Sequence, residues 1–127
     1  VKVQWLWDSA SSNYMRWIDK DKSFDFDKSQ INAKNVVVLF MQYKASSADP
    51  RSPEAQSLGE GEAWVYTNGS LVKGKWSRAK ETDVFTLVDL AGAPIKLTPG
   101  RTWIELPRAN KGADIAAGSD PAKIKFP

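Results

Sequence analysis

The fold of this chain is decided by the stretch GEGEAWVYTNGSLVKGKW, residues 59–76. Its Asn68-Gly69 pair separates two runs in which apolar and polar residues alternate, which is the strongest short-range signal for a β-hairpin. A type I′ turn at this pair places Tyr66 opposite Leu71 and Trp64 opposite Lys73. Since side chains alternate between the two faces of a strand, the same register gives the hairpin two unequal faces.

The first face of the hairpin is predicted to be the core, because it carries Ala63, Val65, Val72, Gly74 and Trp76. We expect the indole of Trp76 to lie over Gly74 and Gly61, which leave room for a ring. The second face carries Glu62, Trp64, Tyr66, Leu71, Lys73 and Lys75. Exposed aromatic rings among charges are typical of a binding surface, and burial under a neighbouring element is the alternative. In either case Lys73 and Trp64 are placed to form a cation–π pair.

The composition is that of one globular domain. The 127 residues are 42% hydrophobic and 26% charged, and the net charge of +3 is spread along the chain. A chain of this length can bury about two-thirds of its unfolded surface. We therefore treat residues 1–127 as a single β-rich domain. A nucleic-acid partner is not expected, because binding one requires a concentrated basic stripe.

Histidine and cysteine are both absent from the chain. Their absence excludes Ser-His-Asp and Cys-His catalysis, as well as thiolate and imidazole metal sites. Catalysis would have to rest on carboxylates, lysine, tyrosine or a bound hard cation. We expect no cofactor.

The remaining sequence favours an all-β fold, an antiparallel β-sandwich or a partly open barrel of about eight short strands with little helix. Besides the hairpin, alternating or apolar runs predict strands at residues 1–7, 14–19, 36–41, 84–89 and 102–106. The run at 36–41 is apolar throughout, as in a central strand buried on both faces. Residues 45–60 hold two prolines and no pattern, which predicts a mobile loop, and residues 108–127 form a weakly patterned tail.

An ordered set of short motifs resembles the C-terminal domain of the YerB-like family of bacterial lipoproteins of unknown function, over residues 14–107. The motifs are Tyr14-x-Arg16, Asn35-Val36-Val37-Val38, Gly59-x-Gly61, Gly69 with Gly74-x-Trp76, Gly92, and Pro99-Gly100-Arg101-Thr102-Trp103-Ile104. The resemblance implies a domain on the extracellular side of the bacterial cytoplasmic membrane, lipid-anchored through a separate N-terminal domain. It implies no catalytic residues.

Carboxylates are the candidates for chemistry. Hydrolysis of a glycan needs two of them across the scissile bond. Asp25 and Asp27 share one strand face if Phe24 and Phe26 point inward, and the same pair has the oxygen ligands that a hard cation such as calcium prefers. The whole pool is Asp25, Asp27, Glu60, Glu62 and Glu105.

Arginines are the candidates for anion binding, since Arg16, Arg78 and Arg101 would suit an anion if they met, and ion pairing at the surface is the alternative. Our leading hypothesis is a non-catalytic cell-envelope module. It would contact a protein partner, its own N-terminal domain or cell-wall glycan through Trp64, Tyr66, Lys73, Lys75, Arg16 and Arg101. The alternative is an envelope hydrolase that uses a carboxylate pair, with a site shared with the N-terminal domain.

Overall fold

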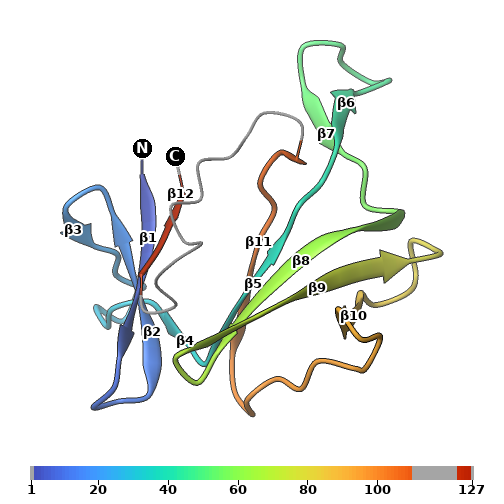
Figure 1. Cartoon of the computed structure of the whole chain (residues 1–127). Helices are drawn as coiled ribbons and strands as arrows, with labels where there is room; N and C mark the ends of the chain where they lie inside the picture. The colour runs from blue at the N-terminus through green and yellow to red at the C-terminus, as the bar shows by residue number, and fades with distance from the viewer. Residues whose placement is uncertain (1, 110–122, 127) are drawn as a thin grey trace.

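The computed structural model describes residues 2–109 and 123–126, and within them twelve strands form two larger sheets and one small hairpin (Figure 1). In chain order the strands are β1 (Val3–Asp8), β2 (Asn13–Ile18), β3 (Asp21–Lys22), β4 (Asn32–Ala33), β5 (Asn35–Leu39), β6 (Tyr43–Ala45), β7 (Pro53–Ala55), β8 (Gly59–Thr67), β9 (Ser70–Arg78), β10 (Thr86–Asp89), β11 (Thr102–Glu105) and β12 (Lys123–Phe126). The all-β prediction is confirmed, although the strands are shorter and more numerous than the expected eight.

The main sheet has the strand order β10-β9-β8-β5-β11. At its centre lies the predicted hairpin, in which Tyr66 pairs with Leu71 and Trp64 with Lys73. Asn68 and Gly69 have φ values of 49° and 74°, the left-handed conformations that a type I′ turn requires. The register predicted from the turn is therefore confirmed.

Strand β5 lies between β8 and β11, and all five of its residues are buried. The pairing of β5 with β11 is parallel, in contrast to the wholly antiparallel sheet that we expected. Buried Asn35 explains the arrangement, because its side-chain amide donates to the carbonyl of Thr98 and the hydroxyl of Thr102. These bonds fix the start of β11 beside the start of β5, so the two strands run in the same direction.

The N-terminal sheet has the order β12-β1-β2-β3, with β4 also paired to β2. It packs sandwich-like against the turn end of the hairpin's second face, and the described strands form no closed barrel (Figure 1). The buried residues of this contact are Trp5, Tyr14, Ala33, Val36, Val38, Tyr66 and Ile124. Of the two alternatives for the second face, burial under a neighbouring element therefore holds at the turn end, where a distant part of the chain covers Tyr66.

The first face forms a second core, built on Val37, Leu39, Met41, Ala63, Val65 and Trp76. As predicted, Gly61 makes room for Trp76, since a Cβ at Gly61 would lie 2.5 Å from the indole nitrogen. Gly74 has a different role from the expected one. A Cβ there would lie 1.9 Å from the carbonyl oxygen of Val88, so Gly74 lets β10 approach β9.

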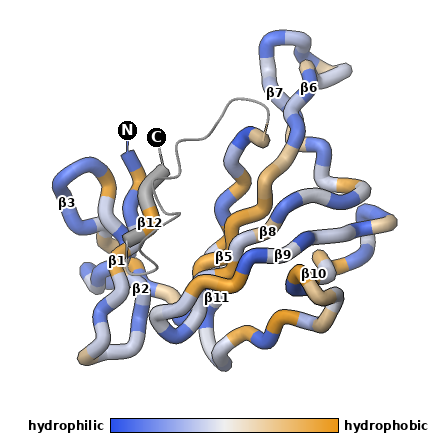
Figure 2. The backbone as a smooth tube through the Cα atoms, viewed as in Figure 1, coloured by the Kyte–Doolittle hydropathy of each residue, from blue (hydrophilic) through white to orange (hydrophobic). Residues whose placement is uncertain are grey.

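The segment expected to be a mobile loop contains part of a small hairpin, because β7 pairs with β6. Its turn is tied by Asp49, whose carboxylate accepts hydrogen bonds from the backbone of Arg51 and the hydroxyl of Ser52. Of the predicted tail, Arg108 pairs with Met41 and β12 pairs with β1, while residues 110–122 and 127 lie outside the described residues. Figure 2 shows a continuous hydrophobic segment along β5. No helix among the described residues is long and apolar enough to span a bilayer.

Candidate functional site

The part of the second face that the N-terminal sheet leaves uncovered is the candidate site, and we call it the open patch. It comprises Phe40, Glu62, Trp64, Lys73, Lys75 and Leu90. Strand pairing aligns Trp64 with Lys73 and Glu62 with Lys75 across the hairpin. Phe40, which directly follows β5, lies beside these residues because its backbone nitrogen donates to the carbonyl of Glu62.

Trp64 is the centre of the open patch and is half-buried. Its ring meets the ring of Phe40 edge to face, with centroids 5.1 Å apart. The Nζ of Lys73 lies 4.5 Å from the Trp64 centroid, which confirms the predicted cation–π pair. The indole nitrogen donates to a carboxylate oxygen of Glu62 at 2.8 Å. An aromatic ring is thus fixed at the surface between a cation and an anion.

Beside Trp64 the open patch contains a hollow of about 400 Å³. It is lined by Glu60, Gly61, Glu62, Lys73, Gly74, Lys75 and Leu90. Leu90, which follows β10, is 80% exposed. The sequence reading missed Leu90 and Phe40. Alternation along β5 would have placed Phe40 on the same face as Val38, whereas no local signal placed Leu90 beside β9.

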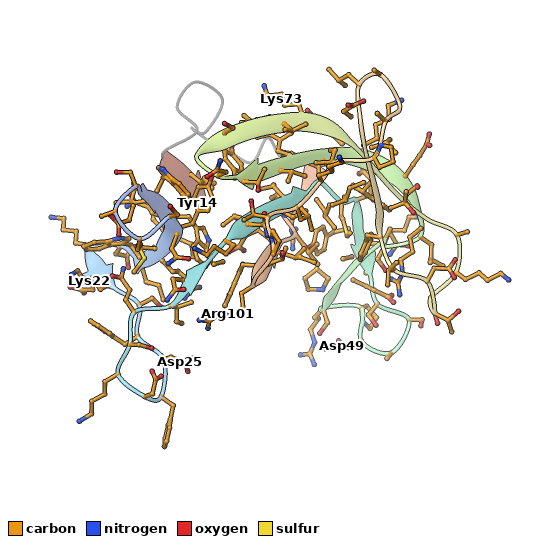
Figure 3. All side chains as sticks on the ribbon, turned by 90° about the horizontal axis from the view of Figure 1, so that it is seen from below. Tyr14, Lys22, Asp25, Asp49, Lys73 and Arg101 are labelled. Carbon is orange, nitrogen blue, oxygen red and sulfur yellow. The ribbon has the colours of Figure 1, made fainter. Side chains whose placement is uncertain are left out.

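Tyr66, Arg16 and Arg101, which the sequence grouped with Trp64, do not belong to the open patch. Tyr66 is completely buried, and burial raises its pKa. The guanidinium of Arg16 lies 5.1 Å from the ring centroid of Trp103 and donates to the hydroxyl of Ser23. In Figure 3, Lys73 and Arg101 lie on opposite sides of the sheet ribbons. Of the predicted binding residues, the structure brings together Trp64, Lys73 and Lys75.

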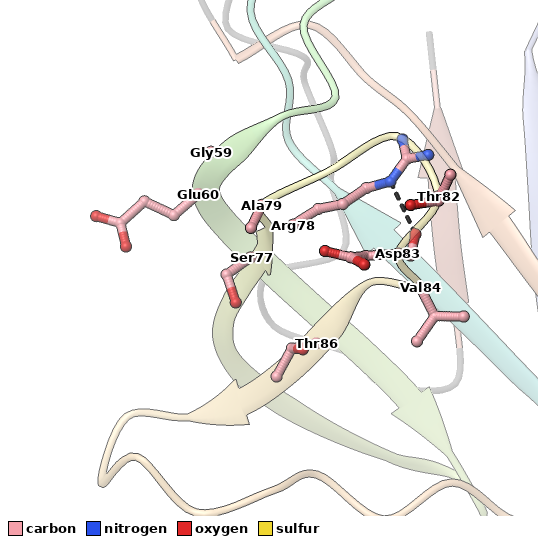
Figure 4. A pocket seen from close by; sticks show the side chains of 9 residues that line it. All are labelled: Gly59, Glu60, Ser77, Arg78, Ala79, Thr82, Asp83, Val84 and Thr86. Carbon is pink, nitrogen blue, oxygen red and sulfur yellow. Dashed lines mark hydrogen bonds between the residues drawn. The ribbon is translucent and has the colours of Figure 1, made fainter.

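Arg78 lies in a wide, open hollow of about 880 Å³ at the far end of β9 (Figure 4). Its guanidinium donates to the carbonyls of Asp83 and Glu81 and to the hydroxyl of Ser57. These bonds hold the turn that leads from β9 to β10. The hydrogen-bonding capacity of Arg78 is therefore directed at two backbone carbonyls and one hydroxyl of the protein itself, and not at an anion shared with Arg16 or Arg101.

Asp25 and Asp27 lie in an exposed turn between β3 and β4. Phe24 and Phe26 are 58% and 101% exposed, so the expectation that they point inward was wrong. The turn reverses the chain within a few residues, and each carboxylate accepts a hydrogen bond from the turn's own backbone. In the described part of the chain, no three acidic side chains gather as a metal site would require.

The other carboxylates also have structural partners or lie in the open. Glu105 accepts a hydrogen bond from the indole of Trp5 at 3.2 Å. Glu60 and Glu62 are neighbours along the same face of β8, and both are exposed. They lie side by side on one strand, whereas a glycosidase holds its two carboxylates on opposite sides of the bond it cleaves.

Residues 1–104 match the family described as the C-terminal domain of DUF3048, a protein of unknown function. The fold is similar to the crystal structure of the YerB protein from Bacillus subtilis, with a TM-score of 0.70 and 14% sequence identity. That similarity covers 83% of this chain and 40% of the YerB chain, so this chain spans less than half of that protein's length. No curated protein matches the sequence.

Proposed function

The chain belongs to the family of DUF3048 C-terminal domains, the YerB-like domains of unknown function, and we propose that it is a non-catalytic binding module that contacts a protein partner through the open patch. The observation that carries the proposal is Trp64, a half-buried ring fixed at the surface by Phe40, Lys73 and Glu62. Protein interfaces concentrate their binding energy on such pre-positioned aromatic residues, surrounded by a polar rim.

The charges around Trp64 support a specific partner. Lys73 and Lys75 lie on β9, and Glu60 and Glu62 lie opposite on β8, so the rim has a basic side and an acidic side. A partner with the reverse arrangement would satisfy both sides in a single orientation. Charge patterns of this kind select the partner and its orientation more than they raise affinity.

A protein partner fits the open patch better than a glycan does. Sugar rings stack on the open face of an aromatic side chain, and the Nζ of Lys73 already lies over the ring of Trp64. The edge of Phe40 meets the same indole. A protein loop that fills the hollow next to Leu90 would keep these contacts, whereas a stacked sugar would have to displace Lys73.

A non-catalytic role is also supported by the use of the carboxylates. Asp25, Asp27 and Glu105 accept hydrogen bonds that hold their own turn or the neighbouring sheet. At Asp27 the hydrogen bonds from Ser29 hold the pKa below its usual value, which opposes the protonated carboxyl that a hydrolase needs as its general acid. We place the module, as part of the same proposal, on the extracellular side of the bacterial cytoplasmic membrane, in line with the resemblance to YerB-like lipoproteins.

Affinity capture from an envelope extract tests the proposal. The bait proteins are the wild type, a Trp64→Ala, Leu90→Ala double variant and a Val84→Ala control. Val84 is 85% exposed, much like Leu90, but lies outside the open patch. We expect a protein that the wild type and the control retain to be lost from the double variant. Equal recovery of every protein by all three baits would contradict the proposal, as would binding to purified peptidoglycan alone.

A further inference from the structure

A second surface feature stands apart from the open patch. The chain between β3 and β4 forms a tight loop, residues 24–30. It projects from the body of the molecule, and its position is marked by the label of Asp25 in Figure 3. Phe26 at its tip is 101% exposed and Phe24 at its base is 58% exposed. A phenyl ring gains more from burial than nearly any other exposed side chain, so two of them on one small loop call for an explanation.

The loop is ordered by its own hydrogen bonds. Phe24 and Gln30 close its base as an antiparallel bridge. Inside the loop, the backbone of Asp25 donates to the carbonyl of Ser29 at 2.8 Å, and the backbone of Lys28 donates to the carbonyl of Asp25 at 2.9 Å. The Phe26 ring is therefore presented on a backbone that loses little conformational freedom when it binds, and binding energy is not spent on ordering it.

The two neighbours of Phe26 in the sequence, Asp25 and Asp27, are acidic. Asp25 accepts a hydrogen bond from the backbone of Phe26 at 2.7 Å. Asp27 accepts hydrogen bonds from the hydroxyl and the backbone of Ser29, and the hydroxyl bond is the main cause that holds the pKa of Asp27 below its usual value. Arg101 adds a smaller effect in the same direction. With Lys28 included, the tip carries two negative charges against one positive charge.

From this arrangement we infer that the loop at residues 24–30 is an anchor for a second protein surface, a partner with an apolar pocket bordered by lysine or arginine side chains. Phe26 fills the pocket, Phe24 covers its edge, and the carboxylates of Asp25 and Asp27 meet the basic border. The loop belongs to the N-terminal sheet and the open patch to the main sheet, so the two surfaces can engage different partners or separate parts of one partner.

The acidic residues argue against a lipid bilayer as the target of Phe26. Insertion of the ring would draw the two flanking carboxylates into the headgroup region, where they would lose water and would be repelled by anionic lipids. Loops that bind bilayers place basic residues at these positions, because those residues are attracted by the surface potential.

Site-specific photo-crosslinking in the full-length protein tests the inference. A photoreactive phenylalanine analogue is placed at position 26 in the source cells, and at position 84 as a control, because Val84 is similarly exposed. We expect position 26 to give a crosslink to one protein that position 84 does not give. The crosslinked segment of that protein should combine apolar residues with lysine or arginine. Crosslinks to lipid alone, or the same products from both positions, would overturn the inference.

Binding to the crosslinked protein is then measured with purified variants. Phe26→Ala should weaken binding by about 10- to 100-fold, the value of one buried phenyl ring. Asp25→Asn with Asp27→Asn should weaken it by about 3- to 10-fold and reduce its dependence on salt. Since Phe26 makes no core contact, Phe26→Ala should keep the wild-type melting temperature. Unchanged affinity in both variants would overturn the inference that this loop is an anchor. The proposal for the open patch would not be affected, because the capture experiment tests it separately.

Discussion

The two ends of the hairpin's second face have the same strands and the same alternation, yet they differ in burial. At the turn end, Tyr66 is completely buried under Trp5 and Tyr14 of the N-terminal sheet. At the other end, Trp64 is half-buried and its neighbours Lys73 and Lys75 are exposed. The difference is not encoded in the hairpin. It comes from the position of the N-terminal sheet, which is built from the two ends of the chain and covers the turn end.

The contact at the turn end is specific as well as apolar. The backbone N–H of Gly69 donates to the hydroxyl of Tyr14 at 3.0 Å. The ring of Trp7 packs against Tyr14 with centroids 4.8 Å apart, and a Cβ at Gly69 would lie 2.9 Å from the Trp7 indole nitrogen. The N-terminal sheet therefore contacts the backbone of the hairpin turn. This contact fixes how far the N-terminal sheet extends along the second face.

The same substitution at the two ends should have very different effects, and this is the largest contrast we expect. Trp5→Ala should lower the free energy of unfolding by about 3–5 kcal/mol, because it empties a fully buried site between the sheets. Trp64→Ala should lower it by about 1–2 kcal/mol, since that ring is only half-buried and loses one aromatic and one cation–π contact. Urea unfolding followed by circular dichroism measures both. Similar losses would mean that the open end is as much part of the core as the turn end.

High pH should weaken the turn end. Burial raises the pKa of Tyr14 to about 12, whereas the phenol in the unfolded chain has a pKa of about 10. Above pH 10 the unfolded chain therefore releases a proton that the folded chain still holds. The contribution of Tyr14 to stability is complete below about pH 10 and is lost as the pH rises to about 12, by about 2–3 kcal/mol in total.

Urea unfolding at a series of pH values between about 9 and 12 measures this loss, and Tyr14→Phe is the control. The variant cannot ionise at position 14, so its stability should fall less steeply with pH than that of the wild type. The pKa of Tyr66 is raised mainly by burial and less by the charge of Tyr14, so only its contribution from burial is retained in both proteins. Parallel curves for the two proteins would contradict the role of Tyr14.

The sequence predicted well those features of the fold that depend on residues close together in the chain. Asn68-Gly69 requires a two-residue turn, and the turn by itself sets the register down to the Trp64–Lys73 pair. The buried strand at 36–41 was also predictable, because an apolar run without polar breaks has no solvent-facing side. The alternation in this hairpin gave its two faces but could not show that both are partly covered.

What the sequence could not predict depends on contacts between distant segments. Leu90 reaches the open patch because Gly74 lets β10 pair closely with β9. The parallel placement of β11 rests on Asn35, whose polar side chain gave no hint that it is buried and bonded to residues more than sixty positions away. Phe24 and Phe26 alternate with Asp25 and Asp27 as residues of a strand would, but the chain turns there, so the alternation does not bury one side.

A smaller contrast separates the turn at Gly69, which packs against Trp7, from the turn at Gly92, whose Cβ position is open. Gly69→Ala should destabilise the domain by about 2 kcal/mol, because it combines a positive φ with a collision against Trp7. Gly92→Ala should destabilise it by about 1 kcal/mol. The φ of Gly92 is similar, at 83°, but nothing lies within 4 Å of its Cβ position, so backbone strain alone applies. Urea midpoints of the two variants give the comparison, and equal losses would show that Trp7 yields freely and does not hold the turn.

The smallest contrast lies within the open patch, between two lysines on the same face of β9. Lys73→Met should lower the free energy of unfolding by about 0.5–1 kcal/mol, because it removes the cation from the ring of Trp64. Lys75→Met should change it by less than about 0.5 kcal/mol, as is usual for an exposed surface position. In the proposed binding assay the order should persist, since Lys73 also fixes the orientation of Trp64. If Lys75→Met reduced partner binding more than Lys73→Met did, the basic rim would contribute more to recognition than the positioned ring, and the partner's acidic side would be the feature to seek.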